Sequence, residues 1–116
     1  MTWLLVAIGA AVGAPLRYLT DRAIQARHTT AFPWGTFTVN VTGCAILGAV
    51  AGAAVSTELY ALLGTGLCGA LTTYSTFSYE TFRLAGTGRP GVALANAATS
   101  ALTGTAALIL AFELTR

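Results

Sequence analysis

Four long apolar stretches, separated by short segments that carry most of the charge, account for nearly the whole chain. They cover residues 2–20, 35–55, 59–84 and 91–114. Each approaches or exceeds the roughly 20 apolar residues that a helix needs to cross the hydrocarbon core of a bilayer. The pattern therefore predicts an all-α membrane protein in which residues 1–116 form a single domain of four transmembrane helices.

The charged residues are distributed unevenly over the connections between these stretches. The first and third connections, Asp21–Pro33 and the segment AGTGRP at 85–90, lie on one side of the membrane if all four stretches cross it. That side and its adjoining helix ends hold Arg17, Arg22, Arg27, Arg83 and Arg89, whereas the other side holds Arg116 with Glu58 and Glu113. Because positive residues favour the cytoplasm, the bias predicts that both termini lie outside.

Composition supports a membrane protein and excludes several functions. Hydrophobic residues make up 55% of the chain and charged residues only 9%, against roughly 25% charged in soluble domains. The mean hydropathy is +0.72, so the expected environment is membrane lipid. The net charge of +2 comes from scattered arginines, which gives no basic patch for nucleic acid. We find no acid–base pair, activated nucleophile or phosphate loop and therefore expect no enzyme activity.

Glycines recur at helical spacing in two of the stretches. Gly9, Gly13 and Arg17 share one face of the first, and Gly48 and Gly52 share a face of the second. Small residues at such spacing let membrane helices approach closely, where lipid supplies no hydrophobic drive for association. This spacing predicts a tightly packed bundle.

Neutral polar residues also align within the apolar stretches. Thr36, Asn40 and Gly43 share one face of the second stretch, and Asn96 and Ser100 share a face of the fourth. Such residues either hydrogen-bond between helices or line a hydrated path. The aligned set with two asparagines favours a path that solvates an ion.

The third stretch contains GLCGALTTYSTF, residues 66–77, near its centre. Glycines weaken a helix and hydroxyl side chains can satisfy freed backbone groups, so the segment predicts either a break or a kinked helix. Non-helical backbone at membrane depth is tolerated where it is buried in protein or lines a cavity. Freed carbonyls there could hold a cation, and freed N–H groups or hydroxyls an anion.

Three ordered motifs carry a resemblance to a known family. They are GAAVGAPLRY at 9–18, GTFTVNVTG at 35–43 and GLCGALTTYSTFSYE at 66–80. Together with the length and the four stretches, they make the chain resemble the Fluc (CrcB) fluoride-channel family. The resemblance implies an antiparallel, dual-topology dimer with two fluoride pores between its subunits and a third helix broken at mid-membrane. It also implies a structural sodium ion at the dimer interface, held by the backbone carbonyls of Gly69 and Thr72 from both subunits.

The resemblance further assigns the residues of the pore. Asn40 would hydrogen-bond fluoride, Thr36 lies one turn away, Tyr74 and Phe77 are the paired pore aromatics, and Arg17 would attract anions at the vestibule. The polar track would continue through Ser75, Thr76, Asn96 and Ser100. Dehydrating fluoride without compensation costs on the order of tens of kcal/mol. Amide N–H groups, hydroxyls and the positive edges of aromatic rings can replace the lost water.

The chain departs from the family pattern at two positions. The first pore aromatic, usually Phe, is Tyr74, whose hydroxyl could hydrogen-bond a passing anion or obstruct it. Asn96 aligns where many relatives have Tyr. Because a homodimer needs one sequence that inserts both ways, the arginine bias keeps two assemblies open, a homodimer and a heterodimer with a paralogous chain.

These observations predict a passive, fluoride-selective channel in a prokaryotic plasma membrane that exports cytoplasmic fluoride and so reduces its toxicity. One alternative is a non-conducting or half-functional subunit of a heterodimeric channel. A second is a small multidrug-type antiporter, which predicts a membrane carboxylate in the first stretch, where this chain has Arg17 instead.

Overall fold

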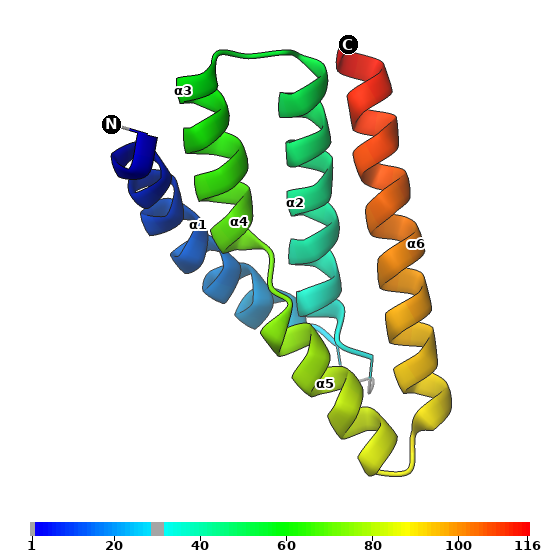
Figure 1. Cartoon of the computed structure of the whole chain (residues 1–116). Helices are drawn as coiled ribbons and strands as arrows, with labels where there is room; N and C mark the ends of the chain where they lie inside the picture. Colours follow the sequence, from blue (N-terminus) through cyan, green and yellow to red (C-terminus); the bar gives the residue numbers. More distant parts are fainter. Residues whose placement is uncertain (1, 29–31) are drawn as a thin grey trace.

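The structure, a computed structural model, describes residues 2–28 and 32–116, and the regular structure within these residues is helical throughout (Figure 1). The elements in chain order are α1 (Thr2–Gln25), α2 (Trp34–Gly52), α3 (Thr57–Tyr60), the π-helix η1 (Ala61–Cys68), α4 (Gly69–Leu71), α5 (Ser75–Gly86) and α6 (Pro90–Thr115). Residues 29–31 of the predicted first connection, and Met1, lie outside the described residues.

Three of the described helices, α1, α2 and α6, are long and apolar enough to cross a membrane. They contain 24, 19 and 26 residues, respectively. The predicted third stretch is a succession of shorter elements instead of one helix: α3, η1 and α4 run on continuously, and α5 begins after an interruption. The fold is thus all-helical and apolar, as the pattern of the sequence predicts.

The first helix extends five residues beyond the predicted end of its stretch. The prediction ended at Thr20 because charged residues begin at Asp21, but α1 continues to Gln25. Polarity limits how far a helix can lie in lipid, not how far it can extend. The added turn is supported locally, because Arg22 Nη1 donates a hydrogen bond to the Tyr18 hydroxyl at 2.9 Å, and its guanidinium lies over that ring.

Chain ends and connections divide between the two ends of the molecule. The N-terminus, the C-terminus and the connection from α2 to α3 lie at one end, and the connections from α1 to α2 and from α5 to α6 lie at the other (Figure 1). Arg89 therefore lies at the end opposite to Glu58 and Arg116. This is the separation of charges that the sequence predicts.

Glycines bring the helix backbones into contact at two interfaces. A Cβ added at Gly9 of α1 would lie 2.7 Å from the Leu67 nitrogen of η1, and one added at Gly66 would lie 2.6 Å from the Val6 carbonyl oxygen. A Cβ at Gly48 of α2 would likewise collide with the Leu108 carbonyl of α6. The predicted close packing through small residues is confirmed.

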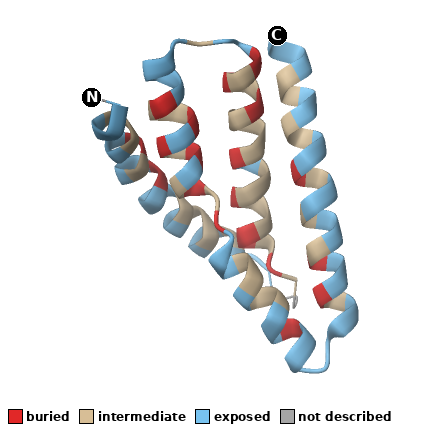
Figure 2. Cartoon of the chain, in the orientation of Figure 1, coloured by how far each residue is buried: buried red, intermediate tan, exposed pale blue. Residues whose placement is uncertain are grey.

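Large apolar side chains remain exposed along the outer faces of the long helices (Figure 2). They include Val12 and Leu19 on α1, and Leu94, Leu102 and Leu110 on α6. A soluble monomer rarely exposes so much contiguous apolar surface. Lipid is the solvent that such faces require.

Candidate functional site

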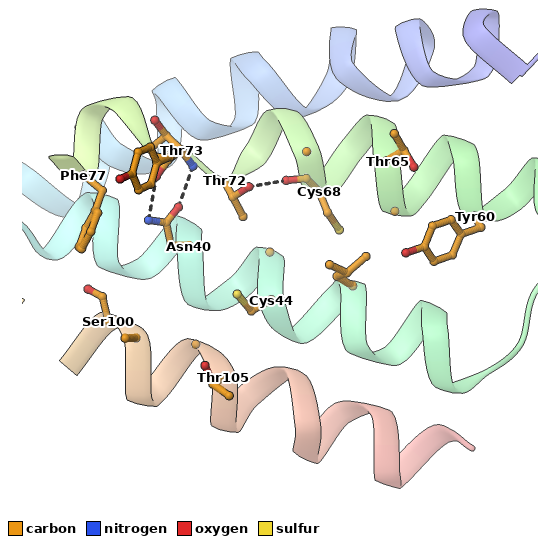
Figure 3. Close-up of a pocket in the computed structure, with 17 residues that line it drawn as sticks. Asn40, Cys44, Tyr60, Thr65, Cys68, Thr72, Thr73, Phe77, Ser100 and Thr105 are labelled. Atoms are coloured by element: carbon orange, nitrogen blue, oxygen red, sulfur yellow. Dashed lines mark hydrogen bonds between the residues drawn. The ribbon is translucent and has the colours of Figure 1, made fainter. Parts of the chain in front are cut away.

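A groove of about 640 Å³ lies between α2, α6 and the interrupted segment from η1 to α5 (Figure 3). The residues that line it include Asn40, Thr72, Thr73, Tyr74, Phe77 and Ser100. Among the described residues, no charged side chain lines this groove. Its polar groups are hydroxyls, a carboxamide and backbone amides.

The helical interruption lies at this groove, between Leu71 and Ser75. Thr72 has an extended backbone (φ −78°, ψ 161°), which ends α4. Two N–H groups that would continue the helix are redirected to side chains. Thr73 N donates to Asn40 Oδ1 at 2.7 Å, and Thr76 N donates to Thr73 Oγ1 at 3.2 Å.

Redirecting these donors changes the hydrogen bonding of two carbonyl groups. In a continuous α-helix, Thr73 N would bond the carbonyl of Gly69 and Thr76 N would bond that of Thr72. Both donors are instead held by side-chain oxygens. The carbonyls of Gly69 and Thr72 are therefore deprived of their helical donors at the edge of the groove.

Asn40 holds the interruption with a second hydrogen bond. Its Nδ2 donates to the Thr73 carbonyl oxygen at 3.1 Å, so the carboxamide bonds both backbone groups of one residue (Figure 3). A carboxamide carries two N–H donors, and the second proton on Nδ2 is left for another acceptor. Asn40 can thus position the backbone and still donate to an anion.

Sequence reasoning did not single out Thr73, although it is the partner of Asn40 and is 9% exposed. Its hydroxyl accepts from the N–H three residues later, which is the geometry of a helix N-cap. A threonine shortly before the residues that resume the helix is the pattern that could have identified Thr73. Four neighbouring residues also carry hydroxyls, so the sequence does not show which of them caps the helix.

The predicted site residues divide into three groups in the structure. Asn40, Gly69, Thr72, Tyr74, Phe77 and Ser100 line the groove. Arg17, Thr36 and Thr76 line a second, smaller cavity, which Thr73 also borders. Ser75 is exposed at the first position of α5 and is not among the residues that line either cavity.

Asn96 lies at a helix contact within this subunit. It is fully buried, its Nδ2 donates to Thr81 Oγ1 of α5 at 2.8 Å, and Ser100 Oγ donates to its Oδ1 at 3.4 Å. It is not among the groove-lining residues, whereas Ser100, one turn later, is. Its assignment to the polar track stays a prediction.

The two aromatics predicted to line the pore are side by side at the start of α5. The ring centroids of Tyr74 and Phe77 are 6.5 Å apart. Tyr74 is 81% exposed in the single chain, so most of its ring is open to a neighbouring molecule.

A further hydrogen bond ties α2 to α5 on the side of the smaller cavity. Thr36 Oγ1 donates to Glu80 Oε1 at 2.6 Å. The hydroxyl donates and a carboxyl oxygen accepts, so this bond links the two helices side chain to side chain. Together with the Asn40 pair, it fixes the start of α5 against α2, and sequence reasoning gave Glu80 no such role.

The arrangement suits the binding of a small ion without covalent chemistry. The groove offers neutral donors in apolar surroundings, where each hydrogen bond is electrostatically stronger than in water. The described residues contain no group of three His, Cys, Asp or Glu side chains that could hold a metal ion. A cation held here would therefore bind to backbone and hydroxyl oxygens.

Comparison with known proteins places the chain in a family. Residues 4–112 match the family described as CrcB-like protein, Camphor Resistance (CrcB). The fluoride-specific ion channel FluC 1 of Frankia casuarinae is 59% identical over 125 residues, covering 100% of this chain and 97% of that protein. FluC 1 of Streptomyces avermitilis is 63% identical over 108 residues, covering 90% and 87%.

A relative that is named FluC 2 instead of FluC 1 is also similar to this chain. The fluoride-specific ion channel FluC 2 of Rhodococcus jostii is 49% identical over 115 residues, covering 99% of both chains. These relatives are ion channels and not enzymes. The match over nearly the whole length and identities of about half or more lead to one conclusion: the chain belongs to the CrcB family.

Proposed function

We propose that this chain is a subunit of a fluoride-selective channel that lets cytoplasmic fluoride leave a prokaryotic cell passively through the plasma membrane. The observation that carries the proposal is the Asn40–Thr73 pair at an interrupted helix, which leaves one amide proton of Asn40 for an anion. The relatives named as fluoride-specific channels supply the identity of that anion.

Selectivity for fluoride follows from the chemistry around Asn40. Small anions lose a large hydration energy on entering an apolar channel, on the order of tens of kcal/mol. Asn40 Nδ2 and the ring edges of Tyr74 and Phe77 are the groups that would replace the water, and the Ser100 hydroxyl would join them by turning its proton away from Asn96 Oδ1. None of these groups is a cation that would trap the ion.

The partner that completes the channel is a second subunit in antiparallel orientation. The groove is open on one side, and a Cβ added at Gly69 would meet no atom within 4 Å in the isolated subunit. Tyr74 also projects outward there. Four membrane crossings, with the third interrupted at mid-membrane, would let an inverted copy cover the groove and bring both interruptions together.

The residues present fit the proposed structural sodium ion. The carbonyls of Gly69 and Thr72 have lost their helical donors to Asn40 and Thr73, and freed carbonyls of unwound helices are suitable sodium ligands. Two subunits would supply four such oxygens. Such an ion would give these backbone carbonyl oxygens the partner that the interrupted helix does not supply.

The dimer is tested by Gly69→Val. Because open space surrounds Gly69, the subunit tolerates the added side chain, but a covering subunit does not. We expect the variant to fold and to be monomeric by size-exclusion chromatography with light scattering. Gly91→Val is the matched control, since it is also in open space but lies outside the groove. A dimeric Gly69→Val variant would show that the groove is not the interface.

Channel activity is tested by reconstituting the purified chain alone in liposomes loaded with fluoride. An ion-selective electrode follows efflux, with chloride-loaded liposomes as the control. Fast fluoride efflux without chloride efflux, in the absence of a proton gradient, supports a self-sufficient homodimeric channel. Absence of fluoride efflux from folded protein refutes it.

The second assembly, a heterodimeric half, is supported by Tyr74 in place of the usual Phe and by the arginines gathered at one end. Coexpression with a paralogous chain distinguishes it from the homodimer. Fluoride efflux that appears only from the mixed complex would identify this chain as one of two unlike subunits. An antiporter would instead need a proton gradient to move its substrate.

A further inference from the structure

The smaller cavity has a volume of about 170 Å³ and lies where α1, α2 and the start of α5 meet. Arg17, Tyr18 and Asp21 line it from α1, Thr36 from α2, and Thr73 and Thr76 from the interrupted segment. Thr73 also lines the groove, so one residue borders both spaces. Arg17 thus lies in the cavity that shares Thr73 with the groove.

The carboxylate of Asp21 is held in this cavity without a hydrogen bond. Its Oδ1 is buried and has no partner among the residues that the structure describes. It lies against Gly35 in the first turn of α2, where any Cβ would collide with it. Gly35 therefore provides the space that lets an acidic group of α1 reach the cavity.

Arg17 lies one helical turn before Asp21 and lines the same cavity. Within residues 2–28 and 32–116, Arg17 makes no ion pair shorter than 4.0 Å, and no hydrogen bond of its side chain is found. The guanidinium of Arg17 and the carboxylate of Asp21 therefore both contribute charge to the cavity, and they do not form an ion pair with each other.

The two charges have opposite effects on an entering anion. Arg17 attracts it, and Asp21 lowers the attraction. Conduction requires a site that binds an ion well enough to admit it and weakly enough to release it. We propose that Asp21 is the residue that limits anion affinity at this entrance, so that fluoride attracted by Arg17 moves on to Asn40 and is not retained. This inference rests on the proposed function.

A purely structural role for Asp21 predicts different behaviour. A carboxylate beside the first turn of α2 interacts favourably with the positive end of the helix dipole. If that were its whole role, Asp21→Asn would lower stability and leave anion affinity unchanged. Affinity is therefore the readout that separates the two roles.

The test compares Asp21→Asn, Arg17→Gln and the double variant in the full chain. Asn keeps the shape of the side chain and removes its charge. Glu58→Gln is the matched control, because it removes an exposed acidic group at the other end of the subunit. Initial fluoride flux from liposomes is measured against fluoride concentration, and fluoride binding to protein in detergent is followed by ¹⁹F NMR line broadening.

We expect Asp21→Asn to lower both the half-saturating and the dissociation constant for fluoride by roughly ten-fold or more, because a unit negative charge that repels the anion is removed from the lining of the cavity. Arg17→Gln should raise both constants, the double variant should return near the parent, and Glu58→Gln should change neither.

Unchanged constants in a less stable Asp21→Asn variant would overturn the inference and leave Asp21 a residue that only stabilises the first turn of α2 through the helix dipole. Failure of the proposed function is a separate result, because a parent chain without flux can still be titrated with fluoride. In that case, binding that does not tighten in Asp21→Asn overturns the inference, and tighter binding supports it.

Discussion

Replacing Asn40 with alanine removes both hydrogen bonds that hold the interrupted helix against α2. The Thr73 N–H and carbonyl lose partners at 2.7 and 3.1 Å, and Thr73 is buried, so water does not readily replace them. The N–H then has one nearby alternative, the Gly69 carbonyl four residues earlier. The variant therefore either leaves two buried groups unpaired or closes part of the interruption.

Two estimates set the size of the effect. Leaving a buried donor or acceptor unpaired costs about 1–3 kcal/mol in soluble proteins, whereas side-chain hydrogen bonds in a membrane protein average about 0.6 kcal/mol. Because two bonds are lost and one N–H can find another acceptor, the expected loss lies at about 1–3 kcal/mol. We expect fluoride flux to fall as well, since the amide donor for the anion is gone.

The measurement is the free energy of unfolding in mixed micelles titrated with SDS, followed by far-ultraviolet circular dichroism. Thr38→Val is the matched control on the same helix, because the Thr38 hydroxyl bonds only the Trp34 carbonyl of α2 itself, at 2.7 Å. Its loss should cost no more than about 0.6 kcal/mol. An Asn40→Ala variant as stable as this control, with unchanged fluoride flux, would refute the role given to the Asn40 pair.

Three further predictions test other contacts. Gly9→Val should destabilise the chain by about 1–3 kcal/mol, because the added side chain separates α1 from η1. Gly86→Val is the control, since its added side chain lies in open space and should not have this packing cost; unfolding in SDS compares the two variants. Thr36→Val should cost about 1–3 kcal/mol by leaving Glu80 Oε1 without its donor, and Thr36→Ser, which keeps the hydroxyl, should restore the stability. Tyr74→Phe should leave unfolding unchanged and retain fluoride flux, because the ring edge is kept; a large loss of flux would show that the hydroxyl contacts the anion.

The packing was predictable from the sequence because it depends on periodicity. Glycines four residues apart must share a helical face, and in lipid that face associates closely with another helix. The contacts of Gly9 and Gly48 follow from that rule. The region of the interruption could be predicted as well, because glycines and hydroxyl residues are gathered there in one apolar stretch.

The partners within the site were not predictable in the same way. Helical spacing groups Asn96 with Ser100 but does not determine which neighbour each residue meets. In the structure Asn96 meets Thr81 of α5, while Ser100 lines the groove. Likewise, the choice of Thr73 over its neighbours depends on the residue at which α4 ends, and a shift of one residue would present the backbone N–H and carbonyl of another residue to Asn40.

Asp21 shows a third limit of sequence reasoning. Its polarity marked the end of an apolar stretch, and the helix itself continues through it. The turn that follows the apolar stretch places Asp21 in a cavity with Arg17. A residue assigned to a connection thereby becomes part of the lining of the smaller cavity, an outcome that depends on Gly35 of another helix.

The interruption links the anion chemistry of the groove to its proposed cation chemistry. The hydrogen bond from Thr73 N to Asn40 Oδ1 orients the carboxamide and also withdraws a donor from the Gly69 carbonyl. One bond therefore positions the group that would bind fluoride and frees an oxygen that would bind sodium. If both ions bind as proposed, Asn40 variants should weaken sodium binding as well as fluoride flux, although Asn40 contributes no ligand to the sodium ion. Loss of fluoride flux with unchanged sodium binding would show that the two sites are independent.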